Sequence, residues 1–171
     1  MSGLGPLAVA SQEYGRVAAW LFEEARVLDQ GRFQDWLALM SGDLVYRMPV
    51  REAILPRDGG GIDPEIGFFV ENFSSLKTRV ARLGTDQAWA EQPASRTRHL
   101  ISNIQVEQVV EGFAVTSAFL VARIRSDNPY DLFTGERQDL LREESACLRL
   151  VRRTILLDQT IIKSSNLSMF F

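Results

Sequence analysis

The spacing of large apolar residues in the first part of the chain predicts helices. Between Ser11 and Gly31 these residues recur mostly every third or fourth position, which is typical of an amphipathic helix with one buried face. Ser11 is a favourable N-cap, and Gly31 stands where a helix commonly ends. The same spacing predicts a second, short helix from Phe33 to Met40, which Gly42 would close.

Farther along, alternating apolar and polar residues predict strands. In residues 43–50 the even positions are apolar and share one face, and Pro49 indicates an edge strand or a strand end. Four further segments follow, and they are expected to pair as antiparallel strands. The predicted strands are residues 43–50, 100–109, 113–125, 136–143 and 148–162.

Between the first strand and the later ones, residues 51–66 are rich in proline and glycine and are predicted to form a loop. Its glycines, Gly59–Gly61, are followed by neither a Gly-Lys-Ser/Thr sequence nor a dinucleotide fingerprint, which argues against a phosphate-binding loop. Residues 73–83 show helical spacing again, and Gly84 is expected to end this third helix.

Helices followed by long antiparallel strands indicate an α+β fold, with the helices packed on one face of a curved sheet. A length of 171 residues is that of one domain, and such a chain can bury about 70% of its unfolded surface. We therefore expect a single domain over residues 1–171, with residues 1–10 as a flexible N-terminal arm.

Composition and charge argue against several partners. The net charge of -3 gives no electrostatic reason to expect nucleic acid or an anionic membrane. No apolar run approaches the roughly 20 residues needed to span a bilayer, and the first residues do not resemble a signal peptide. The single cysteine, Cys147, fits a reducing compartment. We expect a cytoplasmic protein.

The supply of metal-binding side chains is too small for a redox centre. The chain has 1 histidine, His99, and 1 cysteine, Cys147. A Rieske cluster needs two of each, a mononuclear iron facial triad needs two histidines, and the common structural zinc sites need four such ligands. Cys147 begins an apolar strand, where a buried and inert thiol is expected. We predict no metal or cofactor in this chain.

His99 could act as a general base, but a structural or interface role is the stronger interpretation. Its neighbours Arg96 and Arg98 favour the neutral, hydrogen-bonding form of its imidazole. Catalysis by carboxylates stays open, because a small α+β cone can hold an apolar pocket with an Asp or Tyr base. The candidates for such a base are Asp43, Tyr46 and Asp158.

The last segment, 147–171, combines features that seldom occur together. Arg152, Arg153 and Asp158 interrupt an apolar strand, and charges inside a sheet need partners, so Asp158 could simply pair with one of these arginines. Residues 169–171 are Met-Phe-Phe, and apolar residues of this kind are expected to be docked. They could pack on their own domain or also help to build an interface between subunits.

Several segments resemble the β (small) subunit of aromatic-ring-hydroxylating dioxygenases, the Rieske non-haem iron oxygenases. The resemblance covers residues 13–171 and is carried by EARVLDQGRFQDWLAL, VYRMPVRE, LKTRVARLGTDQAWAEQPASRTRHLISNIQV, GERQDLLRE and RRTILLDQTIIKSSNLSMFF. The third and fifth segments are the most specific. One departure is Leu148, where the family usually has an aromatic residue.

The resemblance implies a cone-shaped fold similar to nuclear transport factor 2 (NTF2) and ketosteroid isomerase. It also implies an α3β3 hexamer in which the α subunit carries the Rieske [2Fe–2S] cluster, the mononuclear iron and the substrate pocket. The holoenzyme would convert an aromatic compound to a cis-dihydrodiol with O2 and electrons from NAD(P)H, delivered by a reductase, often with a ferredoxin. The β subunit would be mainly structural and inert alone.

From the resemblance and the clustering of charge, we expect no catalytic residue in this chain but a set of subunit-interface residues. These candidates are Trp89, Arg96, Arg98, His99, Arg152, Arg153, Asp158, Phe170 and Phe171. Charge-assisted bonds from the arginines would fix the register of the subunits. Two alternatives remain: a stand-alone isomerase or dehydratase of the same fold with an Asp/Tyr pocket, and a plain dimerisation module.

Overall fold

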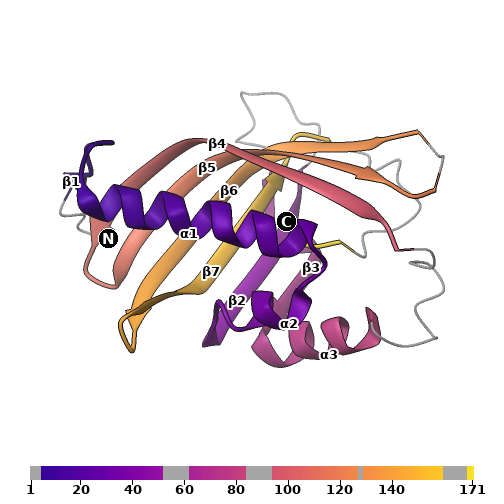
Figure 1. The fold of residues 1–171 in the computed structure, drawn as a ribbon, viewed down its shortest axis with the longest axis horizontal. Coiled ribbons are helices and arrows are strands. Elements are labelled where there is room, and N and C mark those ends of the chain that lie inside the picture. The colour runs from indigo at the N-terminus through magenta and orange to yellow at the C-terminus, as the bar shows by residue number, and fades with distance from the viewer. Residues whose placement is uncertain (1–4, 52–61, 84–93, 127–128, 160–168) are drawn as a thin grey trace.

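A single sheet organises the protein, and helices pack against it (Figure 1). The computed structural model describes residues 5–51, 62–83, 94–126, 129–159 and 169–171. Within this part the sheet has 7 strands and is strongly curved. The expected α+β architecture, with helices on a curved sheet, is confirmed.

The first helix forms as its sequence predicts. α1 (Gln12–Asp29) is capped by Ser11, whose side chain accepts a hydrogen bond from the backbone N of Tyr14 at 3.2 Å. After the helix, Gly31 has a φ of 67°, a left-handed conformation that glycine adopts without the strain of a Cβ. The predicted apolar face is the buried one.

The other two helices are short. α2 (Phe33–Leu37) ends earlier than predicted, because Met40 and Gly42 already belong to the first long strand. α3 (Phe73–Leu83) is confirmed, with Leu76 and Val80 buried, whereas its predicted stop, Gly84, lies outside the described residues.

The strands follow the order β1-β4-β5-β6-β7-β2-β3. Neighbours are antiparallel, as predicted for β4 to β7, except that β7 and β2 are parallel. Their bounds are β1 (Gly5–Pro6), β2 (Met40–Arg51), β3 (Ile62–Asn72), β4 (Arg96–Val109), β5 (Gly112–Ile124), β6 (Asp131–Glu144) and β7 (Cys147–Leu157).

Some expectations about the sheet are wrong. Residues 62–66, predicted as loop, begin β3, because pairing with β2 outweighs the local turn signals. Within the expected flexible arm, Gly5 and Pro6 pair with β4. β2 is not an edge strand, but Pro49 does lie near its C-terminal end, the other position that the sequence indicated. It sits there at a register irregularity, where its missing N–H is tolerated.

The predicted last strand is too long at its C-terminal end. β7 stops at Leu157, and the remainder of the prediction, residues 160–162, lies outside the described residues. β4 and β6 begin earlier than predicted, at Arg96 and Asp131. On β5 the predicted alternation is confirmed, since the odd positions from 113 to 123 are buried.

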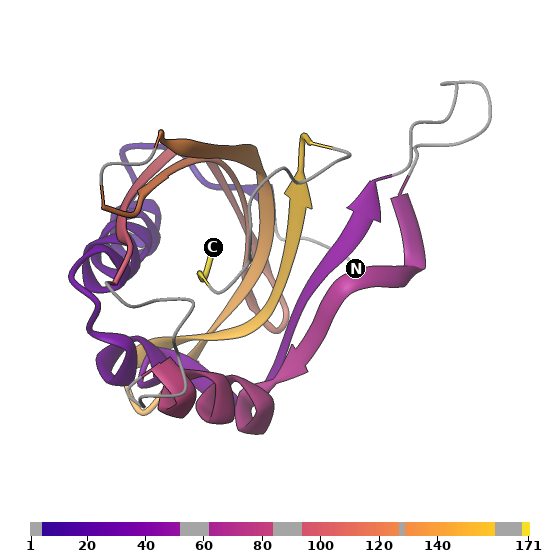
Figure 2. The same ribbon diagram turned by 90° about the vertical axis from the view of Figure 1, so that its right-hand side faces the viewer.

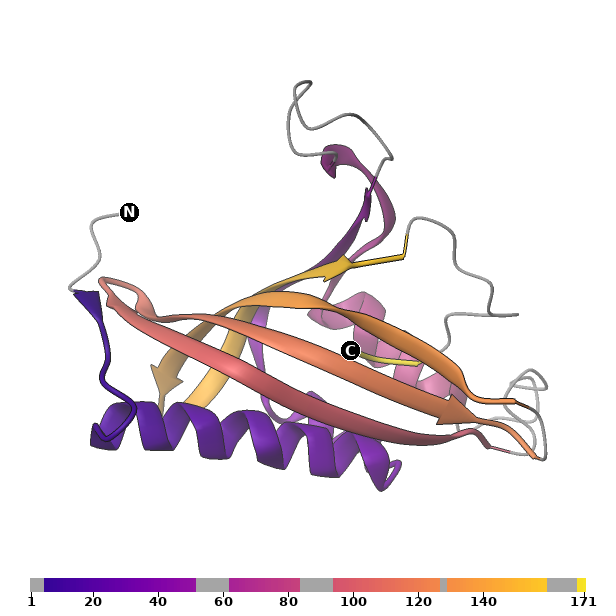
Figure 3. The ribbon, with the colours of Figure 1, turned by 90° about the horizontal axis from the view of Figure 1, so that it is seen from above.

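The curvature of the sheet creates the interior in which the candidate site lies. Figure 2 looks into the curl and shows the C-terminal residues inside it, and Figure 3 shows α1 running along β4. α3 contacts β2, β3 and α2. Phe170 and Phe171 are buried in the main hydrophobic core, so the tail packs on its own domain.

Candidate functional site

At the centre of the interior lies a fully buried arginine with two carboxylate partners. Arg153 on β7 donates from Nε and Nη2 to the two carboxylate oxygens of Asp139, at 2.8 and 2.7 Å. From Nη1 and Nη2 it also donates to the two oxygens of Glu24, at 2.6 and 2.9 Å. Each partner is therefore held in a two-point fork, the strong geometry for a guanidinium and a carboxylate.

Three elements bring these charges together. Glu24 lies on the buried face of α1, among its apolar residues. Asp139 faces Arg153 across the β6–β7 pair, and Tyr46 faces Arg153 across the β7–β2 pair. The charges of this buried ionic centre thus come from α1 and the adjacent strands β6 and β7, and β2 supplies the neighbouring Tyr46.

Arg137 completes this centre, which we define as Glu24, Arg137, Asp139 and Arg153. Arg137 Nη1 lies 3.3 Å from Glu24 Oε2, and Trp36 Nε1 donates to Glu24 Oε1 at 3.1 Å. Two cations thus face two anions. Arg137 is the less well satisfied cation, because its Nε and Nη2 have no hydrogen-bond partner within the described part of the chain.

The charges compensate one another despite their burial. Burial by itself would raise the pKa of Glu24, but Arg153 and Arg137 outweigh it and lower that pKa. Burial likewise opposes the charged form of Arg153, yet Asp139 and Glu24 raise its pKa well above the usual value. For Arg137 burial prevails, with repulsion from Arg153, and its pKa is lowered.

The C-terminal residues are attached to this centre. Arg153 Nη1 donates to the main-chain oxygen of Phe171 at 2.7 Å. The Tyr46 hydroxyl lies 3.0 Å from both the main-chain oxygen and the backbone N of Phe171, so it can donate to the first and accept from the second. Burial raises the pKa of Tyr46, which keeps the hydroxyl protonated. Tyr46 is therefore a ligand of the tail rather than a base.

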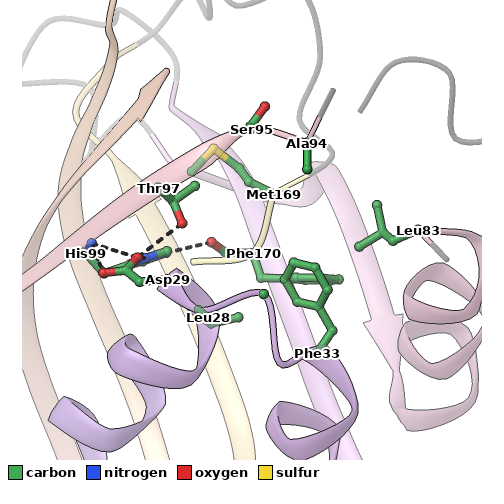
Figure 4. A pocket seen from close by; sticks show the side chains of 11 residues that line it. Leu28, Asp29, Phe33, Leu83, Ala94, Ser95, Thr97, His99, Met169 and Phe170 are labelled. Atoms are coloured by element: carbon green, nitrogen blue, oxygen red, sulfur yellow. Dashed lines mark hydrogen bonds and ion pairs between the residues drawn. The ribbon is translucent and has the colours of Figure 1, made fainter. Parts of the chain in front are cut away.

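A histidine–carboxylate pair, His99 and Asp29, also contacts the C-terminal residues (Figure 4). His99 Nδ1 is 2.5 Å from Asp29 Oδ1, and the backbone N of His99 donates to both Asp29 oxygens at 3.1 Å. Thr97 Oγ1 also donates to Asp29 Oδ1, at 3.1 Å. Burial would raise the pKa of Asp29, but the hydrogen bonds from His99 outweigh it and lower that pKa, so the carboxylate is ionised.

The other ring nitrogen of His99 lies 3.1 Å from the carbonyl oxygen of Phe170. A carbonyl and an ionised carboxylate can only accept, so each ring nitrogen of His99 faces an acceptor. The neutral histidine expected from Arg96 and Arg98 stays a prediction. Those two side chains are exposed, whereas the nearest charge to the ring is that of Asp29.

A cavity of about 130 Å³ lies next to this pair. Its walls come from the end of α1, α2, α3, β4 and the tail, and Figure 4 shows Thr97, Asp29 and His99 on one side and Phe33 and Leu83 on the other. The volume approaches the roughly 150 Å³ of an apolar cavity that takes up benzene. A small apolar or aromatic group would fit there.

The whole chain is similar to proteins of one known family. The model of the family described as "Ring hydroxylating beta subunit" matches residues 23–164. The chain belongs to this family. It is 38% identical to the benzene 1,2-dioxygenase subunit beta of Pseudomonas putida and 38% identical to the chlorobenzene dioxygenase subunit beta of a Cupriavidus species. Each alignment covers 97% of this chain and 92% of the relative.

Solved structures show the same fold. Naphthalene 1,2-dioxygenase with indole bound matches with a TM-score of 0.81 at 24% identity, over 99% of this chain and 90% of that one. A putative scytalone dehydratase from Novosphingobium aromaticivorans matches with a TM-score of 0.65 at 18% identity, over 90% and 89%. The NTF2-like cone expected from the sequence is therefore confirmed, and the fold is shared by proteins of different function.

The predicted interface residues of this ring-hydroxylating β subunit fall into two groups. Arg96, Arg98, Arg152 and Asp158 are exposed, and their interface role stays a prediction. His99, Arg153, Phe170 and Phe171 are buried within the chain itself, where their contacts are internal. Trp89 lies outside the described residues.

Three predictions about individual residues are wrong. Arg153 pairs with Asp139 and Glu24, not with Asp158, which is exposed. Cys147 is exposed rather than buried. Neither carboxylate candidate for a base lies in a buried pocket, because Asp43 is held at the surface by Arg142 and Ser41 and Asp158 is exposed.

Sequence reasoning missed four residues of the site: Glu24, Asp29, Arg137 and Asp139. A signal for three of them was available. Glu24 is an acid on the apolar face of a predicted helix, and Arg137 and Asp139 occupy alternate positions of a predicted strand. Charges at core-facing positions indicate buried partners. Asp29, at the end of its helix, gave no such signal.

The described residues contain no group of three or more His, Cys, Asp or Glu side chains arranged to hold a metal ion. In the same part of the chain, none of the helices has the length and apolar character of a membrane span.

Proposed function

We propose that this protein is the structural β subunit of a bacterial ring-hydroxylating dioxygenase and is inert alone. Support comes from family membership over nearly the whole chain and from the interior of the cone. There the chain's own Met169, Phe170 and Phe171 are buried in the core. The ionisable groups of the interior are engaged with one another and with this tail.

The redox groups of such an enzyme do not fit this chain. A Rieske cluster and a mononuclear iron site each need at least two histidines, and the chain has 1 histidine and 1 cysteine. We therefore place both groups, and the substrate pocket, in a partner α subunit. That complex would add both atoms of O2 to an aromatic ring in the cytoplasm, giving a cis-dihydrodiol, with electrons from NAD(P)H through a reductase, often with a ferredoxin.

The outer face of the sheet supports a scaffolding role within an α3β3 hexamer. Leu100 on β4 faces Leu120 on β5, and their exposed fractions are 54% and 38%. In the neighbouring row, Leu132 on β6 is 55% exposed and lies in register, across Ala122 of β5, with the exposed Arg98 on β4. Apolar side chains with arginines at their margin are typical of a surface that another subunit covers.

The test is to purify the chain alone and together with its α subunit. The isolated chain should bind no iron and consume no O2 with an aromatic substrate and reduced electron donors, whereas the complex should do both. Turnover or stoichiometric iron in the isolated chain would refute the proposal.

The surface prediction has its own test. Arg98→Ala and Leu120→Ser should weaken assembly with the α subunit in sedimentation experiments at low concentration, while the isolated chain keeps its melting temperature. Arg26→Ala, an exposed arginine on α1, is the matched control and should leave assembly unchanged. Full assembly of both outer-face variants would show that the interface lies elsewhere.

A further inference from the structure

The three C-terminal residues are held in a way that differs from ordinary core packing. Their carbonyl oxygens are bonded by side chains of four different elements. Met169 O accepts from Arg79 Nη2 of α3 at 2.6 Å, Phe170 O lies 3.1 Å from His99 Nε2 of β4, and Phe171 O is bonded by Arg153 of β7 and Tyr46 of β2. Consecutive carbonyls held by side chains are a feature of peptide recognition, because main-chain bonds provide affinity independently of side-chain identity.

The aromatic rings of the tail occupy separate sites. The Phe170 ring lies 4.3 Å from the Trp36 ring and 5.6 Å from Phe33, and Arg79 Cζ lies 4.5 Å from its centroid. The Phe171 ring sits 5.7 Å from Phe119 and 5.6 Å from Phe133. Each ring thus has its own aromatic neighbours, which select for side chains of this shape.

We propose that this arrangement is a peptide-binding site and that residues 169–171 occupy it as a tethered ligand. We call the site the tail cradle and define it by Trp36, Tyr46, Arg79, His99, Phe133 and Arg153. Its ligand class is a short peptide with two consecutive aromatic residues after a flexible apolar one. The cradle belongs to the folded body of the chain, so it accepts the same peptide when that peptide is supplied as a separate molecule.

The energetics favour binding in trans. The two phenylalanines are 2% and 1% exposed, so the burial of their rings favours the bound state. Hydrogen bonds from charged donors add to this when they form in a buried site. Covalent attachment makes binding of the tail intramolecular, so the site remains filled in the intact chain.

The experiment uses the full chain with a specific protease site inserted between Ser164 and Ser165. After native cleavage, the fragment that carries residues 169–171 should stay bound during gel filtration. A labelled peptide Ser-Asn-Leu-Ser-Met-Phe-Phe should then exchange into the cut protein with saturation. The same peptide with alanine at both phenylalanine positions is the control and should not compete.

His99 provides a direct readout of occupancy of the tail cradle, because it is the single histidine of the chain. Its ring ¹⁵N signals should shift when the fragment leaves and return when the peptide binds, since Nε2 faces Phe170 O. If the rest of the chain unfolds without the fragment, the yield of refolded protein is measured in the presence of each peptide. Only the Phe-Phe peptide should restore folding.

A second variant tests the contribution of the backbone bonds. Arg79→Met should weaken peptide binding by about 10-fold or more, because it removes a charged donor to Met169 O. Arg26→Met, on the exposed side of α1, should have no effect. Failure of the labelled peptide to enter the folded cut chain, or equal competition by the alanine peptide, would overturn the proposal. None of these outcomes depends on the α subunit, so they are separate from the test of the proposed function.

Discussion

Two clusters in this protein use the same arginine–carboxylate geometry in opposite environments. In the buried ionic centre, Arg153 and Asp139 form a fork whose side chains are both 0% exposed. At the surface, Arg142 forms a fork with Asp43, at 2.9 and 3.1 Å, and those side chains are 37% and 59% exposed. The hydrogen-bond distances are similar, so the two clusters differ in their exposure to water and not in their geometry.

That difference decides what each cluster does. The charges of a surface ion pair are solvated whether or not the pair forms. Such a pair therefore contributes little to the free energy of unfolding, typically about 0–1 kcal/mol. A buried pair has lost its water, so removing one partner leaves the other as an uncompensated charge. The buried ionic centre therefore acts as a clamp that joins α1, the sheet and the tail, whereas the surface cluster, with Ser41 and Glu144, joins only the ends of β2 and β6.

The largest expected effect is that of Arg153→Met. It leaves Glu24 and Asp139 without their main partner, and we expect a loss of about 3–5 kcal/mol in the free energy of unfolding measured with urea. Arg152→Met, the exposed neighbour on the same strand, is the matched control and should change stability by less than about 0.5 kcal/mol. Equal stability of both variants would show that the buried ionic centre is not a clamp.

Phe170→Ala should come next, with a loss of about 3 kcal/mol. The substitution removes a ring that is 2% exposed and enlarges the neighbouring cavity. Phe68→Ala on β3, where the side chain is 40% exposed, serves as the control and should cost much less. Thermal unfolding of both variants provides the comparison, and similar melting temperatures would mean that the tail adds little to stability.

Matched acid-to-amide substitutions compare the two clusters directly as a function of pH. The pKa of Glu24 in the folded state is lowered from its ordinary value of 4.5. The charge of Glu24 therefore stabilises the folded protein above pH 4.5, and this stabilisation is lost as the pH falls through the folded-state pKa. Glu24→Gln should cost about 2 kcal/mol at pH 7, and the difference from the unaltered protein should shrink below pH 4.5. A difference that stays constant down to pH 3 would contradict this linkage.

Asp43→Asn should have the smallest effect. Hydrogen bonds from Arg142 and Ser41 lower the pKa of Asp43 from 3.8 to about 2, so its contribution is present above 3.8 and is lost as the pH falls through about 2. Because this carboxylate is solvent-exposed, screening reduces the contribution to about 0–1 kcal/mol, and added salt should reduce it further. Urea unfolding at low and high salt measures it. A loss as large as that of Glu24→Gln would mean that burial does not separate the clusters.

The elements that the sequence predicts well are those whose signal is local. α1, α3 and the alternation of β5 follow from residues within a few positions of one another, and they form as expected. β3 was missed because its Pro64 and Gly67 are turn signals, and only the backbone of β2 supplies its pairing partner. Arg153 was recognised as a charge that needs partners, but its partners lie 129 and 14 residues away in the chain.

The sequence by itself determined the fold class, the family and the unsuitability of the chain for a redox metal site, because these depend on spacing, segment similarity and the count of available ligands. The tertiary structure alone decided which charges face one another, that His99 is paired with Asp29, and that the tail fills the interior of the cone. Those outcomes depend on the curvature of the sheet and on the removal of water, and neither property is encoded in any single stretch of residues.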